Sequence, residues 1–276
     1  MENHLVFYLN LYIVHPSYLI MTYEEIYNNE NSEFFTYVKN TNQKPLLIKK
    51  IIEKLDSKIN KYEKFIFTDI GAGDGIITIP VIEYLKNKTN LLCHCLEPSN
   101  LINEFKKKCE FENIEYHKEK IEWFEIPKSD FILMSHVLTQ KEDYISIVKK
   151  IYNSLNKGGF ALIVTTNKES DDVKLKFKLR ENPKRLKNVV LTDSILDYLK
   201  SNNIVYKHEE IDTDIDYSGG FNLTKEGKDM LAFFHKKPFI NITEEEIKKF
   251  QDELKKLNVS GRITKKEDYI WIYKSK

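Results

Sequence analysis

The sequence predicts an α/β fold, a doubly wound sheet in which helices separate most successive strands. Short apolar runs alternate with amphipathic segments of helical length through residues 65–165. The first run leads into a glycine-rich turn, residues 71–75, and the second ends in the carboxylate of Glu97. Strands joined by helices of this length form right-handed crossovers, so we expect the core of the sheet to be parallel.

The predicted elements follow the hydrophobic periodicity in chain order. Pro45 suits the first turn of a helix, Thr192 can cap a later one, and Thr243 with Glu246 forms a capping box at the last. The predicted helices are 33–39, 45–55, 76–86, 100–109, 142–155, 194–200, 225–235 and 244–257. The predicted strands are 65–70, 91–96, 114–116, 131–135, 160–165, 205–211 and 268–273.

We expect one domain over residues 22–276, with helical additions at 32–58 and 217–260. Both additions can reach the carboxyl ends of the strands, where ligands bind in open α/β sheets. They therefore predict a substrate cap, and the alternative is that 217–260 is only a packing appendage. Residues 1–21 are expected to be an extension that is either disordered or the result of a start codon assigned too early, since the sequence after Met21 is typical of a domain start.

Composition narrows the class of protein. The 43 basic and 42 acidic side chains leave a net charge of +1, which argues against a nucleic-acid partner. No apolar run is long enough to span a membrane, and the three cysteines form no C-x-x-C pair. We expect a cytoplasmic monomer that acts on a small molecule.

The turn after the first strand predicts a ligand site. Asp69 precedes three glycines at alternate positions, where a backbone without side chains can approach a ligand closely. The dinucleotide fingerprint G-x-G-x-x-G would need a glycine in place of Ile76. Glu97 can accept hydrogen bonds from both ribose hydroxyls of a nucleoside, although a charged residue at a strand exit is also common.

Three landmarks in this order resemble the class I methyltransferases that use S-adenosylmethionine (SAM). The third is Leu155-Asn156-Lys157-Gly158-Gly159, which is similar to the L-K-P-G-G turn of these enzymes, with Lys157 in place of the proline. The resemblance implies a Rossmann-like, seven-stranded methyltransferase sheet. Within this class the chain resembles the histamine N-methyltransferase group, on the sequences 97–99, 117–119 and 130–134 and on the length and acidic start of the segment between the last two strands.

The resemblance implies a set of site residues. The methionine part of SAM would lie against Gly71, Ala72 and Gly73, and the ribose against Glu97, followed by Pro98 and Ser99. Lys120 and Ile121 would lie near the adenine, and Ser135 and His136 would face the sulfonium and the substrate. The implied substrate residues are Gln43, His136, Thr139 and Phe221.

Departures from that group limit what carries over. Its substrate-binding glutamate is replaced by Gln43, and a neutral amide pairs weakly with a cation, so we expect histamine to be a poor substrate. Its glutamine after the fourth strand becomes His136, and its C-terminal asparagine falls near Lys266 or Glu267. The expected reaction is methyl transfer from SAM to a small amine. The alternatives are O-methylation of a small metabolite and a SAM-fold binding module without turnover.

The sequence leaves two further questions open. His136 is either a general base or a residue that only shapes the pocket. The aromatic residues Trp123, Phe221, Phe233 and Phe234 either wall a pocket or belong to the core. The histidines at 94, 117, 208 and 235 show no metal-ligand spacing, so we expect no metal site. The chain also lacks the [D/N]-P-P-[Y/F] motif of nucleic-acid N-methyltransferases and the Pro-Cys of cytosine-C5 enzymes.

Overall fold

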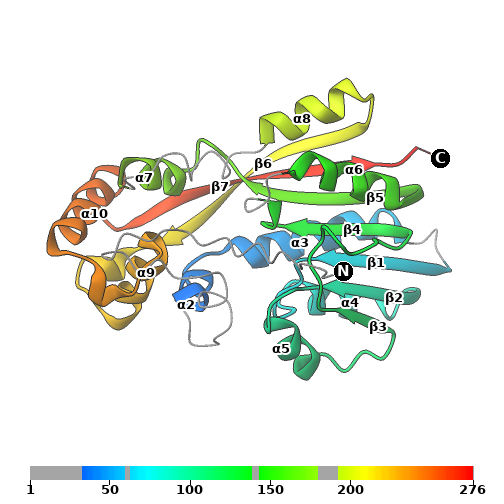
Figure 1. Ribbon diagram of the computed structural model, residues 1–276, viewed down its shortest axis with the longest axis horizontal. Helices are drawn as coiled ribbons and strands as arrows, with labels where there is room; N and C mark the ends of the chain where they lie inside the picture. The colour runs from blue at the N-terminus through cyan, green and yellow to red at the C-terminus, as the bar shows by residue number, and fades with distance from the viewer. Residues whose placement is uncertain (1–32, 60–62, 139–142, 180–191, 276) are drawn as a thin grey trace, which may run out of the picture.

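A computed structural model of the chain describes residues 33–59, 63–138, 143–179 and 192–275. The expectation for residues 1–21 lies outside these ranges, as does the predicted substrate residue Thr139. The described strands form one sheet of seven strands in the order β3-β2-β1-β4-β5-β7-β6. Figure 1 shows helices on both faces of this sheet and a separate helical lobe beyond one end of it.

The predicted α/β fold is confirmed, and most element boundaries agree within two residues. The strands are β1 (Lys64–Ile70), β2 (Asn90–Leu96), β3 (Ile114–His117), β4 (Ser129–Ser135), β5 (Leu155–Thr166), β6 (Val205–Asp216) and β7 (Arg262–Tyr273). The helices are α2 (Glu33–Lys39), α3 (Gln43–Asp56), α4 (Thr78–Leu85), α5 (Leu101–Lys108), α6 (Tyr144–Ser154), α7 (Asp171–Leu179), α8 (Thr192–Ser201), α9 (Lys225–His235) and α10 (Glu244–Leu257), with short 3₁₀ turns η4 (Ser218–Gly220) and η5 (Phe239–Asn241).

The sheet is buried on both faces. Apolar residues of α3, α4 and α5 pack on one face around Phe65, Phe67 and Phe131. Those of α6 and α8 pack on the other face around Ile132 and Ile163. Strands covered on both faces read as continuous apolar runs, which is why the sequence pattern located them well.

Strands β1 to β5 run parallel to one another. Strand β7 runs antiparallel to both of its neighbours, β5 and β6. Strands β6 and β7 are also longer than predicted and stay paired from Val205↔Tyr273 to Asp216↔Arg262. Their outer halves are rich in charged residues, with Asp212, Asp214 and Asp216 on β6 and Arg262, Lys265, Lys266 and Glu267 on β7, so apolar runs do not mark them in the sequence. Arg262 instead pairs with Asp216 at 3.2 Å across the two strands.

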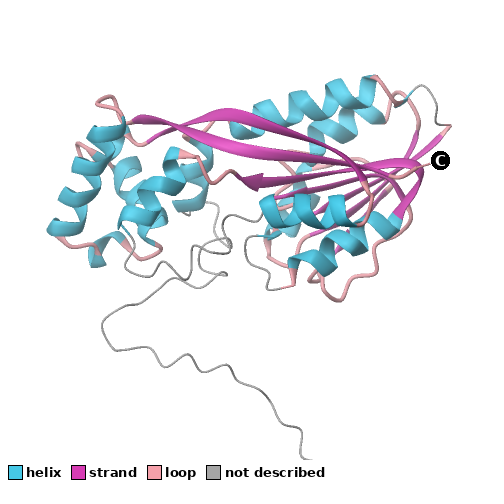
Figure 2. Ribbon diagram, turned by 90° about the horizontal axis from the view of Figure 1, so that it is seen from above, coloured by secondary structure: helices cyan, strands magenta, loops and turns pink. Residues whose placement is uncertain are grey.

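The helical lobe lies at the tip of this long β6–β7 ribbon (Figures 1 and 2). It is formed by α2, α7, α9 and α10, which share an apolar core around Tyr217, Phe234 and Phe250. Helix α7 was not predicted, because its apolar residues Val173, Leu175, Phe177 and Leu179 alternate with lysines, as in a strand. The lobe joins the N-terminal helix α2 to the 217–260 segment, and an isolated bridge between Thr41 and Ile215 links the residues after α2 to β6.

Candidate active site

The glycine turn lies at the carboxyl ends of two neighbouring strands. Gly71, Gly73 and Gly75 have φ values of +80°, +57° and +80°, in the left-handed region that favours glycine. The backbone N–H groups of Gly71 and Ala72 donate to the carbonyl oxygen of Leu96 at 2.7 and 3.1 Å. The turn is therefore held against the end of β2 as well as β1.

The three glycines have different surroundings. A Cβ atom on Gly71 would lie 2.2 Å from the side chain of Val137, and one on Gly75 would lie 2.4 Å from the ring of Phe105. The nearest side chain to a Cβ atom on Gly73 would be Leu101, whose Cδ1 would lie 4.0 Å away. Gly71 and Gly75 are thus glycines for packing reasons. Gly73 borders open space, where a ligand can reach its backbone.

Glu97 connects the glycine turn to the next loop. Its side chain is buried, and Oε2 accepts a hydrogen bond from the Gly73 N–H at 3.1 Å while Oε1 accepts from the Ser99 N–H at 2.9 Å. The Ser99 hydroxyl in turn accepts from the N–H of Leu101 at the start of α5. A carboxylate has about four lone-pair sites, so Glu97 keeps acceptor capacity for hydroxyl groups.

Asp69 lies beneath the turn. It is buried and accepts a hydrogen bond from the hydroxyl of Thr78 in α4. Burial raises the pKa of Asp69 to about 7; the hydrogen bond from Thr78 opposes this shift, and the charge of Glu97 adds to it. The contact with Thr78 ties the end of β1 to the helix that follows the turn.

These residues fit SAM. The open side of Gly73 admits an extended chain close to the backbone, and Glu97 presents a carboxylate beside it. Both features lie at the carboxyl edge of the sheet, where ligands bind in this architecture.

A second polar group lies at the end of β4, and we call Gln43, His136, Lys265 and Glu267 the acceptor cluster. His136 directly follows the strand with a φ of +58°, and its N–H donates to the carbonyl of Val164 at 3.0 Å. Its Nε2 atom lies 3.0 Å from Oε1 of Glu267 and contacts the amide nitrogen of Gln43. Lys265 donates to Glu267 Oε1 at 2.7 Å and to the amide oxygen of Gln43.

The acceptor cluster is mostly buried. Gln43, Lys265 and Glu267 are buried, whereas the side chain of His136 is 26% exposed and can be reached from outside. Burial alone would raise the pKa of Glu267, but the charges of Lys265 and His136 outweigh it and hold that pKa below its usual value. Glu267 is therefore a carboxylate at neutral pH. Its Oε2 atom has no hydrogen-bond partner among the described residues.

The Nε2 atom of His136 can make one hydrogen bond at a time, and two partners, Gln43 and Glu267, lie within reach of it. When it carries no proton it can accept from the Gln43 amide, and when protonated it can donate to Glu267. The cluster can therefore hold the imidazole in either protonation state, which is what a group that takes up a proton requires.

The structure joins some predicted site residues and separates others. It brings Gln43 and His136 into contact, and the neighbouring Val137 packs on Gly71. Ser135 and Pro98 are half-buried at their strand ends. Lys120 is exposed in the turn after β3, and Ile121 beside it is buried in the core.

The four aromatic residues that the sequence analysis named have separate surroundings. Phe221 contacts the lobe near Gly261 and Lys255, Phe233 packs on Tyr37, and Phe234 is buried in the lobe core. Trp123 is 76% exposed. In the described part of the chain these residues do not gather into one aromatic wall.

Two lysines were missed by the sequence analysis. Lys265 precedes Glu267 by two positions on β7, so both side chains point to the same face; this spacing was the available signal. Lys44 is half-buried, and burial lowers its pKa to about 8, opposed by Asp74 of the glycine turn and reinforced by Lys108 and Lys265. Lys44 thus lies within the electrostatic reach of both the turn and the acceptor cluster.

Among the described residues, no helix combines the length and the apolar character needed to cross a membrane.

Comparison with known proteins gives the same fold and one family. The family model described as "Methyltransferase domain" matches residues 45–203, more than half of the chain. The YcgJ protein of Bacillus subtilis has 16% identity and a TM-score of 0.58, over 83% of this chain and 98% of that one. A protein of Bacillus halodurans C-125 has 13% identity and a TM-score of 0.57, over 82% of this chain and 99% of that one.

A third similar structure was solved with ligands. The plantazolicin methyltransferase BamL, in complex with a triazolic desmethyl analogue and S-adenosylhomocysteine, has 14% identity and a TM-score of 0.52. The match covers 88% of this chain and 90% of that one. At these identities the likeness concerns the fold. No curated protein sequence matches the chain.

Proposed function

The chain belongs to the methyltransferase domain family, and we propose that it transfers the methyl group of SAM to an amine nitrogen of a small molecule held at the acceptor cluster. The family and the Rossmann-like fold make it a SAM-dependent methyltransferase. This favours an enzyme over the alternative of a binding module without turnover. The acceptor and the roles of individual residues are the proposal.

The position of the acceptor cluster is the observation that carries the proposal. Strand β4 is the neighbour of β1, so His136 and the glycine turn stand at adjacent strand ends. The contact of Val137 with Gly71 joins the two directly. A nucleophile beside His136 would therefore lie next to the cofactor site and not at a distant part of the protein.

The chain supplies positioning and a proton acceptor. Bound SAM supplies a methyl group on a sulfonium, which is a good leaving group. An ammonium must lose a proton before its nitrogen can attack, and we assign that proton to Nε2 of His136, which gives up the hydrogen bond from the Gln43 amide when it takes the proton. Glu267 stabilises the imidazolium that results, because its carboxylate lies 3.0 Å away. Gln43 and Lys265 hold the Glu267 and His136 side chains in place.

We assign the parts of SAM to residues around the glycine turn. Gly71, Ala72 and Gly73 would line the methionine part, and Glu97 would accept from the ribose hydroxyls. Lys120 and Ile121 would lie near the adenine, and Ser135 near the sulfonium. Lys44 would pair with the methionine carboxylate, which is supported by its place near Asp74 of the turn.

The narrower resemblance to the histamine N-methyltransferase group supports a small amine but not histamine itself. Gln43, which replaces that group's glutamate, already bonds Lys265 and contacts His136. The helical lobe would cover the acceptor as a cap, and Phe221 would line it from the lobe side. A small acceptor fits a cluster whose members are mostly buried.

A second candidate reaction is O-methylation of a small metabolite. The observation that favours it is the buried ammonium of Lys265 within the cluster, since a cation stabilises the oxyanion of a deprotonated hydroxyl. His136 would take the proton from the hydroxyl group in the same way.

Incubation with tritiated SAM tests the acceptor class. The panel should contain small amines including histamine, phenols and carboxylates, together with protein and RNA fractions of a cell lysate. We expect label in a small amine, with little in histamine, and loss of labelling in a Gly73→Val variant. Label in phenols alone would favour the second candidate. Label only in protein or RNA would refute a small-molecule acceptor.

A further inference from the structure

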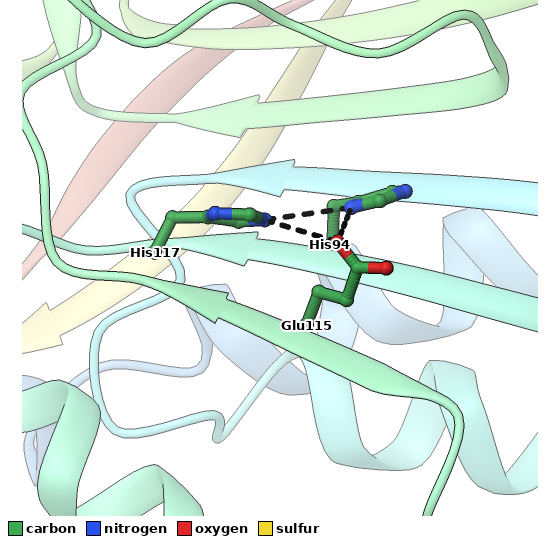
Figure 3. A group of neighbouring side chains, drawn as sticks. All are labelled: His94, Glu115 and His117. Atoms are coloured by element: carbon green, nitrogen blue, oxygen red, sulfur yellow. Dashed lines mark hydrogen bonds and ion pairs between the residues drawn. The ribbon is translucent and has the colours of Figure 1, made fainter.

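Two histidines and a glutamate, none of them part of the acceptor cluster, meet on one face of the sheet (Figure 3). His94 lies in β2, and Glu115 and His117 lie in the edge strand β3. Residues two apart on a strand point to the same face. The pairing of His94 with Glu115 and of Leu96 with His117 brings the three side chains together.

The three potential ligand atoms form a compact triangle. His94 Nδ1 lies 3.3 Å from Glu115 Oε2 and 3.4 Å from His117 Nε2, and the third side, Glu115 Oε2 to His117 Nε2, measures 3.9 Å. Zinc holds nitrogen and oxygen ligands at about 2.0–2.2 Å, which places two ligands of a tetrahedral site roughly 3.3–3.6 Å apart. We propose that His94, Glu115 and His117 bind a divalent transition-metal ion of the zinc class.

The donor set favours this class of ion. Two imidazoles and one carboxylate suit zinc and its neighbours, whereas calcium and magnesium prefer oxygen ligands alone. Three protein ligands leave a fourth position open. The Glu115 side chain is 57% exposed, so water can occupy that position.

The site would stabilise a weakly supported part of the fold. Strand β3 has only four residues and pairs with β2 alone among the described strands. Residues 118–128, which follow it, contain no helix or strand. The His117 ring packs against Phe124 at 4.5 Å, and its carbonyl accepts from the Glu97 N–H at 3.0 Å. An ion bound here would clip β3 to β2, three positions before Glu97.

Isothermal titration of zinc chloride into the untagged, chelator-treated full chain tests the proposal. We expect one equivalent to bind with micromolar or tighter affinity and to raise the melting temperature. Glu115→Gln changes an exposed side chain of equal size and should weaken binding at least tenfold. The matched control Glu112→Gln, also exposed and three positions earlier, should bind as the wild type does. Cobalt in place of zinc should give the visible absorption of a four-coordinate site.

Cysteine thiols also bind zinc, so the cysteines need a control of their own. Cys93 and Cys95 are buried, and Cys109 is half-buried. A Cys109→Ser variant should keep the full equivalent of zinc, and a His117→Ala variant should lose it while circular dichroism shows a folded chain. Equal binding by wild type, Glu115→Gln and His117→Ala, or no binding by the wild type, would overturn the proposal.

Discussion

The Nε2 atom of His136, at the end of β4, lies 3.0 Å from Oε1 of Glu267 in β7. Strand β5 separates these two strands in the sheet, so the contact reaches across it. It is possible because β7 runs antiparallel and its first half continues past the end of β5. The same arrangement places Lys265 beside Glu267 and Gln43, which gives the histidine an anionic neighbour in a buried setting.

Replacement of His136 tests its role as a base. If it accepts the proton, His136→Gln should lower kcat by about 10²-fold or more and flatten the rise of kcat/KM with pH. Glu267→Gln should lower kcat less than His136→Gln does, because it removes the charge that stabilises the imidazolium but leaves the imidazole itself in position. These values come from steady-state rates across pH 6–9. A change confined to KM, with the pH profile kept, would mean that His136 only shapes the pocket.

Glu97 is expected to be central to cofactor affinity. Glu97 accepts from two backbone N–H groups, and we propose that it also accepts from the ribose hydroxyls; removing such a buried carboxylate should cost about 2–3 kcal/mol. Glu97→Ala should therefore weaken binding of S-adenosylhomocysteine by tens of fold, measured by isothermal titration. Glu112→Ala, an exposed change, serves as the control. Unchanged affinity in Glu97→Ala would show that the ribose binds elsewhere.

Gly73 and Gly75 should respond differently to the same substitution. A methyl group on Gly73 would meet no atom closer than 4.0 Å, so Gly73→Ala should lower cofactor affinity at least tenfold with only about 1 kcal/mol of backbone strain. A methyl group on Gly75 would overlap the Phe105 ring, so Gly75→Ala should destabilise the fold by about 1–3 kcal/mol. Thermal unfolding and titration on both variants separate the two effects. Equal losses of stability would contradict the distinction.

Asp69 is expected to make stability depend on pH. Its pKa is about 7 in the fold against 3.8 for the free group, so the folded state binds the extra proton between those values. Stability conferred by that proton is present at low pH and is lost as the pH rises through this window. The Asp69→Asn variant has no carboxyl group to lose a proton, so its stability should not fall in this way. The difference in melting temperature between the variant and the wild type should therefore shift in favour of the variant as the pH rises from 5 to 8. A constant difference across that range would refute the raised pKa.

Lys44 is expected to recognise the carboxylate of the cofactor. Lys44→Met keeps a long apolar side chain but removes the charge, and a charge-assisted bond of this kind contributes about 1.5–3 kcal/mol. Affinity for S-adenosylhomocysteine should fall by more than tenfold, while affinity for methylthioadenosine, which has no carboxylate, should stay within about twofold. Parallel titrations of the two ligands make the comparison. An equal fall for both would place Lys44 in a structural role.

The sequence by itself determined the class of fold, the order of nearly all elements and the glycine turn. These features depend on local properties: apolar runs, helical spacing, glycines at alternate positions and a carboxylate at a strand end. It also pointed to Gln43 and His136, although only through resemblance. Helix α7 was not predicted because the apolar residues in its sequence alternate with lysines, as they would in a strand.

Only the tertiary structure decided which distant residues meet. The pairing of Lys265 with Gln43, of Glu267 with His136, and of His94 with Glu115 and His117 depends on strand order and register. The hydrophobic pattern carries no information on either quantity for strands that are far apart in the chain. A shift of register by one residue turns every side chain to the other face, so these polar groups come together only when the whole sheet has formed.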